Sequence, residues 1–237
     1  TTTTQLATHL AVTAGHRAVA TGNIGVPVLD VVRDPIGFEV LFVELSSFQL
    51  HWMPRSGVGA VRPLASVCLN IADDHLDWHG SREAYVADKA TVYANTRVAC
   101  VFNQDDPATM AMVEDADVQE GCRAIGFGRG APGRSDLGMV GDILVDRAFL
   151  DDRHNSALEL TTHGELELAG LSAPHMLSNV LAAAALARAY GVSVSHVQAG
   201  LASFRLDRHR TEIVAVANGI TWVNDSKATN PHADAAA

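Results

Sequence analysis

Short runs of β-branched and apolar residues alternate along this chain with longer helix-like segments. The runs predict strands at residues 18–21, 40–44, 66–71, 98–103, 123–127 and 213–217. The longer segments predict helices at residues 2–14, 82–93, 174–190 and 195–204, with Gly191 as a natural stop between the last two. Strands that alternate with helices of about 10–15 residues are typical of βαβ units. The sequence therefore predicts an α/β fold with a mostly parallel sheet flanked by helices.

The pattern changes at two places. Residues 128–170 contain short strand-like runs with Gly and Asp, which predict a small antiparallel appendage. Near residues 205–208 a helix is expected to end and a strand to begin, so we expect one domain at 1–206 and the beginning of a second α/β domain at 207–237. The chain opens on four threonines without an initiator Met and closes in alanines, and we interpret it as an internal fragment.

Composition narrows the classes of function. Of the 237 residues, 48% are hydrophobic and 19% are charged, which is ordinary for a globular protein with a core. The formal net charge of -10 argues against a nucleic-acid surface, because binding to phosphate backbones requires an excess of Lys and Arg. The three cysteines form no C-x-x-C pair, and we see neither a signal peptide nor an apolar run long enough for membrane insertion. We therefore expect a cytoplasmic protein.

Two predicted strands end in acidic or histidine side chains. Glu44 closes the apolar run at residues 40–43, and the segment after the next strand contains Asp74, His75 and His79. In open parallel sheets, ligands bind beyond the carboxyl ends of the strands, so both clusters are placed to hold a cation. The alternatives are a carboxylate that caps a helix and histidines that lie on the surface. The spacing of His75 and His79 does not indicate a zinc-protease helix, since the Glu after the first histidine is missing.

Charged residues that could bind a nucleotide or a substrate occur beside the predicted domain boundary. Arg210 lies in the segment 207–210, and Asp225 and Lys227 follow a third strand-like run. Their groups suit a phosphate, a ribose and a carboxylate, although a polar hinge between domains would have the same composition. Lys89 lies inside a predicted helix, where a lysine is ordinarily a solvated surface charge. Together the clusters indicate phosphoryl transfer with bound magnesium.

These clusters resemble the Mur ligase family in content and in order along the chain. The resemblance rests on six motifs: E-L-S-S-F-Q-L at 44–50, the segment 70–77, Tyr85-x-x-x-Lys89, His175-x-x-x-Asn179 with the alanines that follow it, His209-Arg210, and D-S-K-A-T-N at 225–230. The first and last strings resemble the member that adds D-glutamate. The resemblance implies a P-loop-type central domain.

The resemblance implies a magnesium site. Thr1 and Thr2 match the residues that follow the P-loop lysine and are expected at ATP. Thr1, Glu44 and His75 would ligate magnesium, of which two ions are expected. Lys89 would react with carbon dioxide to form a carbamate, which turns a cation into a ligand for the second ion.

The resemblance also implies contacts with substrates. Beside the nucleotide it places Asn179 at the adenine, Arg210 at the phosphates and Asp225 at the ribose. It assigns the substrate contacts to Asn23, Ser46, Gln49, Lys227 and Thr229. One position departs from the family pattern, since Met176 follows His175 where the family often has Asn. A thioether cannot replace an amide as donor and acceptor, which puts one adenine contact in question.

The implied reaction joins D-glutamate to UDP-N-acetylmuramoyl-L-alanine in peptidoglycan precursor synthesis. ATP first converts the L-alanyl carboxylate into an acyl phosphate, and the amine of D-glutamate then displaces phosphate. The implied enzyme is a bacterial cytoplasmic monomer, and the fragment alone is expected to be inactive. Three alternatives remain: another Mur-type or folylpolyglutamate-type amino-acid ligase, a non-catalytic nucleotide-binding homologue, and a metallohydrolase.

Overall fold

The computed structural model describes residues 1–207, 212–224 and 226. Its strands are β1 (Ala18–Gly22), β2 (Val40–Glu44), β3 (Ala65–Cys68), β4 (Ala99–Asn103), β5 (Arg123–Phe127), β6 (Asp136–Val140), β7 (Ile143–Asp146), β8 (Leu158–Thr162), β9 (Glu212–Ala217) and β10 (Ile220–Asn224). Its helices are α1 (Thr2–Thr13), α2 (Val28–Val32), α3 (Ser47–Trp52), α4 (Leu76–His79), α5 (Arg82–Ala90), a 3-10 turn (Thr91–Tyr93), α6 (Pro107–Glu114), α7 (His163–Leu168), α8 (Pro174–Tyr190) and α9 (Val194–Ser203).

The strands form three sheets in the described part of the chain. β1 and β2 make a parallel pair, and β3 to β8 make a six-stranded sheet in chain order. Pairing from β3 to β6 is parallel, whereas β6, β7 and β8 pair antiparallel. The mostly parallel α/β fold is confirmed. The short antiparallel strands predicted within residues 128–170 are present as β6, β7 and β8, and they belong to the main sheet because β6 pairs directly with β5.

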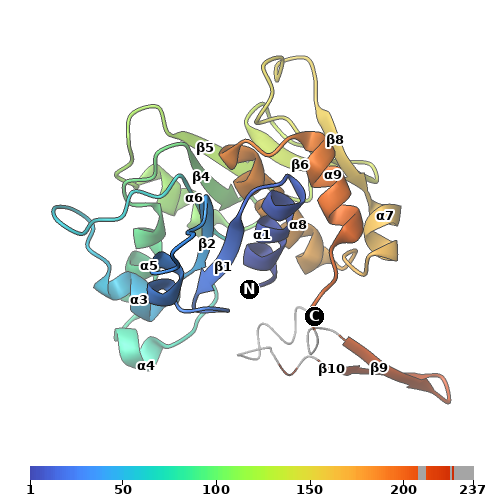
Figure 1. Ribbon diagram of the computed structural model, residues 1–237, viewed down its shortest axis with the longest axis horizontal. Helices are drawn as coiled ribbons and strands as arrows, with labels where there is room; N and C mark the ends of the chain where they lie inside the picture. The colour runs from blue at the N-terminus through green and yellow to red at the C-terminus, as the bar shows by residue number, and fades with distance from the viewer. Residues whose placement is uncertain (208–211, 225, 227–237) are drawn as a thin grey trace.

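The main core lies between two of the sheets, β1–β2 and β3–β8, and a layer formed by three helices, α1, α8 and α9. α1 packs against both α8 and α9, and α8 packs on β3, β4 and β5 (Figure 1). Every alanine from Ala182 to Ala185 is fully buried, so small side chains let α8 approach its neighbours closely. Gly200 of α9 has the same effect, since a Cβ at this position would come within 2.6 Å of Leu10 Cδ2. These contacts hold the start of α1 beside the end of β2.

The predicted elements agree with the structure where capping signals were present. α8 has the predicted bounds, with Pro174 in its first turn and Gly191 in the left-handed conformation at its end. β3 is shorter than predicted and ends at Cys68, whose N–H donates to the buried Tyr93 hydroxyl. Five helices of four to eight residues, α2, α3, α4, α6 and α7, were not predicted. They are too short to show a helical period in the sequence.

Beyond α9 the described residues form a hairpin of β9 and β10, which pair only with each other among the described strands and project away from the other two sheets (Figure 1). Its turn is Asn218-Gly219, with positive φ at both residues, as a two-residue hairpin requires. Arg210, Asp225, Lys227 and Thr229 lie outside the described residues. No helix in the described part is long and apolar enough to span a membrane.

Candidate active site

The carboxyl end of β2 brings three of the predicted residues together. Gly22 is the register partner of Glu44, and the Asn23 N–H donates to the Glu44 carbonyl at 2.7 Å. The Thr1 amino nitrogen lies 2.8 Å from Glu44 Oε2, so the N-terminus of α1 faces this carboxylate. Thr1 is the N-cap residue of α1, and its side chain makes no capping hydrogen bond. A helix N-terminus next to a strand end is a favourable place for an anionic ligand with its cation.

Glu44 fits a metal ligand by its hydrogen bonding. Its Oε2 is buried, and among the described residues its partner is the positively charged Thr1 amino group at 2.8 Å. A buried carboxylate oxygen without a hydrogen bond is costly unless a cation neutralises it. The oxygen is a hard donor of the kind that Mg²⁺ prefers. The buried Glu44 Oε2 therefore supports a cation site at the end of β2.

His75 and Lys89 lie on the neighbouring segments. His75 is the N-cap residue of α4, where it has the left-handed conformation (φ 52°), and its ring lies 4.8 Å from that of Phe48. The Lys89 ammonium lies 5.9 Å from the centre of the Tyr85 ring on α5 and makes no ion pair with a described residue. Across the described residues, no three His, Cys, Asp or Glu side chains lie close enough to hold a metal. The ligand set predicted from the sequence is thus not assembled by these side chains alone.

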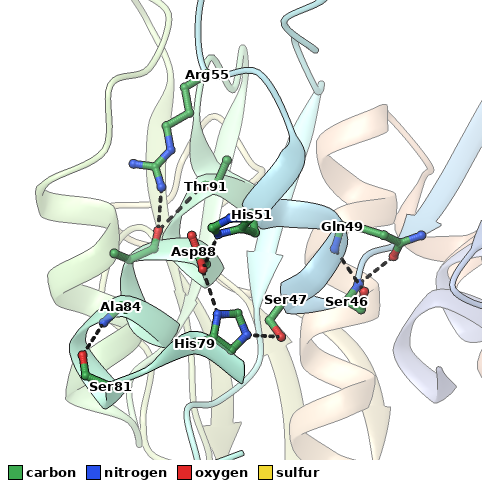
Figure 2. A network of polar contacts seen from close by, with 11 residues as sticks. Ser46, Ser47, Gln49, His51, Arg55, His79, Ser81, Ala84, Asp88 and Thr91 are labelled. Atoms are coloured by element: carbon green, nitrogen blue, oxygen red, sulfur yellow. Dashed lines mark hydrogen bonds and ion pairs between the residues drawn. The ribbon is translucent and has the colours of Figure 1, made fainter. Parts of the chain in front are cut away.

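A polar network ties the same segments together (Figure 2). Asp88 Oδ2 lies 2.8 Å from His79 Nδ1 and 2.9 Å from His51 Nδ1, and His79 Nε2 lies 3.0 Å from the Ser47 hydroxyl oxygen. Burial raises the pKa of the Asp88 carboxyl, but hydrogen bonds from His51 and His79 outweigh it and the net shift is downward. Asp88 is therefore charged, and both imidazoles donate to it through Nδ1.

Ser47, His79 and Asp88 share the order of a hydrolase triad but not its accessibility. The His79 side chain is 0% exposed and Ser47 is 5% exposed, so no substrate carbonyl reaches the hydroxyl. A nucleophilic serine must be open to its substrate. The network also excludes the zinc-protease pattern, since His79 turns to Asp88 while His75 is half-exposed.

Ser46 and Gln49 have a structural role at the start of α3. The Ser46 hydroxyl accepts from the Gln49 N–H at 3.2 Å, and Gln49 Oε1 accepts from the Ser46 N–H at 2.8 Å. This reciprocal capping box satisfies two N–H groups that the first turn leaves without a helical partner. Part of the E-L-S-S-F-Q-L string thus encodes a helix start, and its predicted contact with substrate stays a prediction.

Asn179 connects α8 to α1. The Thr3 hydroxyl donates to Asn179 Oδ1 at 3.0 Å, while Asn179 Nδ2 lies 3.9 Å from the sulfur of Met176. Because a thioether is a weak acceptor, the amide can still donate strongly to another group. Met176 itself is 4% exposed and belongs to the main core. The departure from the family pattern is therefore accommodated by packing.

Sequence reasoning missed the roles of Ser47, His51, His79 and Asp88. The available signal was the pair His75 and His79, one helical turn apart after a strand, together with an acidic residue directly before Lys89. Neither feature shows which side chain turns inward, because that depends on how α3, α4 and α5 pack.

The fold and the strand-end geometry define an α/β protein whose candidate ligand site lies beyond the carboxyl ends of parallel strands. Residues 1–187 match the Mur ligase middle domain. The chain belongs to the Mur ligase family.

Several relatives named UDP-N-acetylmuramoylalanine–D-glutamate ligase are similar over nearly the whole chain. The protein of Leifsonia xyli subsp. xyli is 61% identical over 233 residues, which cover 98% of this chain and 45% of that protein. The proteins of Streptomyces avermitilis and Tropheryma whipplei (strain Twist) are 53% and 50% identical, again over 98% of this chain and 48% of each relative. The chain thus spans a little under half the length of these curated relatives.

Solved structures show the same fold at low identity. A UDP-N-acetylmuramoyl-L-alanyl-D-glutamate–2,6-diaminopimelate ligase has a TM-score of 0.69 at 15% identity, over 92% of this chain and 46% of that one. A MurF ligase from Thermotoga maritima in complex with ADP has a TM-score of 0.61 at 20% identity, over 98% of this chain and 52% of that one.

Proposed function

We propose that the protein to which this chain belongs is an ATP-dependent ligase that adds D-glutamate to UDP-N-acetylmuramoyl-L-alanine. The observation that carries the proposal is the buried Glu44 Oε2 at the end of β2, which faces the N-terminus of α1 and has the positively charged Thr1 amino group as its partner. It supports a site for a cation and an anionic phosphate group in one place. The relatives at 50–61% identity support D-glutamate as the added amino acid. Synthesis of a peptidoglycan precursor from these substrates would take place in the bacterial cytoplasm.

The proposal divides the chain into two parts. Residues 1–206 form the central ATP-binding domain, and residues 207–237 begin the C-terminal ligase domain. The separate pairing of β9 and β10 supports a boundary after α9. Arg210 would contact the phosphates and Asp225 the ribose, and Lys227 and Thr229 would reach substrate from the second domain. We expect a monomer.

In the central domain, Thr1, Glu44, His75 and a carbamylated Lys89 would hold magnesium. Bound magnesium would neutralise charge on the phosphates and make the γ-phosphorus easier to attack. The N–H groups at the start of α1, including that of Thr2, would bind phosphate oxygens. Asn23, Ser46 and Gln49 would orient the muramoyl substrate, and Asn179 would donate to the adenine.

The reaction proposed here has two steps. The L-alanyl carboxylate attacks the γ-phosphorus of ATP, the bond to the bridging oxygen breaks and ADP leaves. The amine of D-glutamate then attacks the acyl carbon, loses a proton and expels inorganic phosphate as the amide forms. The protein contributes positioning and charge neutralisation, which is how phosphoryl-transfer enzymes obtain most of their acceleration.

A second candidate is a Mur-type ligase that adds another amino acid, since the fold is shared with a diaminopimelate-adding ligase. The test measures phosphate release by the complete reading frame with ATP, magnesium and UDP-N-acetylmuramoyl-L-alanine. D-glutamate is compared with L-glutamate, L-lysine and diaminopimelate. Release that requires D-glutamate and is lost in Lys89→Ala supports the proposal. Release with another amino acid selects the second candidate, and release with none contradicts both.

A further inference from the structure

The carboxylate of Asp88 joins three segments that come from different parts of the chain. Asp88 lies on α5, and its Oδ2 accepts from His51 on α3 and from His79 on α4. His79 continues the connection to the Ser47 hydroxyl in the first turn of α3. Figure 2 shows Asp88 between the two imidazoles, with Ser47 on the far side of His79. The Asp88 carboxylate therefore links α5 to both α3 and α4 by hydrogen bonds.

The inner part of this network is shielded from water. The side chain of His79 is 0% exposed and that of Asp88 is 14% exposed, whereas that of His51 is 40% exposed. The His79 ring is also held between aromatic side chains, stacked on Phe48 at 5.7 Å and edge-on to Tyr85 at 5.3 Å. Water cannot readily replace these buried hydrogen bonds, so the relative positions of the three helices are set by them.

Each member of the network lies close in sequence to one proposed metal ligand. Ser47 follows Glu44 by three residues, and Asp88 directly precedes Lys89. His79 follows His75 by one helical turn, and its N–H donates to the His75 carbonyl at 3.0 Å. A shift of any helix in the network would therefore move the ligand attached to it.

We propose that Asp88 and His79 are positioning residues, which hold Lys89 in its place relative to Glu44 and His75. This inference rests on the proposed function, because it concerns the same site. Such supporting partners commonly change metal affinity or activity about 10-fold or more when removed. A purely structural network would instead affect only the stability of the fold.

The experiment compares Asp88→Asn with Asp105→Asn in the complete reading frame. Both changes remove one carboxylate, but Asp105 only pairs with the exposed Arg129, at 3.3 Å. The readouts are Mn²⁺ affinity by electron paramagnetic resonance, the carbamate signal by NMR after incubation with ¹³C-bicarbonate, and kcat and KM for D-glutamate. Lys89 is the only lysine in the described part of the chain, and Lys89→Ala identifies its carbamate signal.

We expect Asp88→Asn to weaken Mn²⁺ binding and to lower kcat by about 10-fold or more, with a reduced carbamate signal and an unchanged KM for D-glutamate. Asp105→Asn should match the parent in Mn²⁺ affinity, carbamate signal, kcat and KM. Asp88→Glu keeps a carboxylate and should lose less Mn²⁺ affinity and kcat than Asp88→Asn. If Asp88→Asn does not fold, His51→Asn removes only the exposed arm and should shift the same readouts by a smaller factor.

The inference is overturned if the folded variants keep the Mn²⁺ affinity and carbamate signal of the parent and lose only thermal stability. Failure of the proposed function has a different signature, since the parent itself would then release no phosphate with D-glutamate. The Mn²⁺ and carbamate measurements do not depend on turnover and decide the inference in either case.

Discussion

Gly22 lies directly opposite Glu44 in the parallel pair of β1 and β2, so closely that a Cβ on Gly22 would overlap the Glu44 carbonyl oxygen. Gly22 also has a φ of +100°, which L side chains rarely adopt. The backbone at the end of β2 can therefore keep its place only if residue 22 has no side chain. Gly22 therefore affects the candidate site through the position of the Glu44 backbone.

Replacement Gly22→Ala should displace the end of β2 and lower both stability and activity. We expect a loss of more than about 2 kcal/mol in the free energy of unfolding, because steric overlap adds to a backbone penalty of about 1–2 kcal/mol. Urea denaturation and phosphate release measure the two effects. Gly15→Ala is the matched control, since Gly15 has a φ of +88° but no atom within 4 Å of the added Cβ. Equal losses in the two variants would show that the overlap is relieved without cost.

Replacement Met176→Asn tests whether the core or the nucleotide determines this position. Met176 is 4% exposed, so an amide at this position would be buried in an apolar cluster. We expect a loss of about 1–3 kcal/mol in the free energy of unfolding, since an unsatisfied buried amide costs that much. Met176→Leu should cost less than about 1.5 kcal/mol, because it conserves volume and polarity. A Met176→Asn variant that keeps its stability and lowers the KM for ATP would contradict the packing account.

The ion pair of Arg188 and Asp146 should be the most costly pair to break. Arg188 Nε lies 2.9 Å from Asp146 Oδ2, and the two side chains are 12% and 0% exposed. Arg188→Ala leaves a buried charge without its partner, for which we expect a loss of about 3–5 kcal/mol by chemical denaturation. Arg129→Ala breaks an exposed pair and should cost about 1 kcal/mol or less. Similar losses for both variants would show that burial does not decide the effect.

His9 should make the protein less stable as the pH falls. Burial lowers the pKa of His9 below its ordinary value of 6.5, and a hydrogen bond with the backbone of Gly200 opposes this only in part. Between the folded-state pKa and 6.5, the unfolded chain therefore binds more protons than the folded one. The contribution of neutral His9 to the free energy of unfolding is fully present above pH 6.5 and is lost as the pH falls through the lower folded-state pKa. Thermal unfolding of His9→Gln should show a smaller loss of stability from neutral to mildly acidic pH than the parent. An unchanged pH profile would remove His9 as the source.

The sequence by itself determined the fold class and most of the longer elements. α8 was predicted with its observed bounds because Pro174 and Gly191 mark its ends. β2 and β5 were predicted because a short apolar run between polar residues is a strand signal that depends only on the local sequence. Glu44 was predicted as a site residue for a general reason: the end of a parallel strand is where ligands bind.

Only the tertiary structure decided which side chains distant in sequence form hydrogen bonds or pack together. His79 and Asp88 look like surface residues in the sequence, yet packing of α3, α4 and α5 brings them into a buried hydrogen-bonded network with Ser47. Met176 looks like a lost ligand contact, and packing makes it part of the core. Hydrogen bonds and burial between residues distant in sequence depend on how helices meet, which local periodicity and capping do not specify.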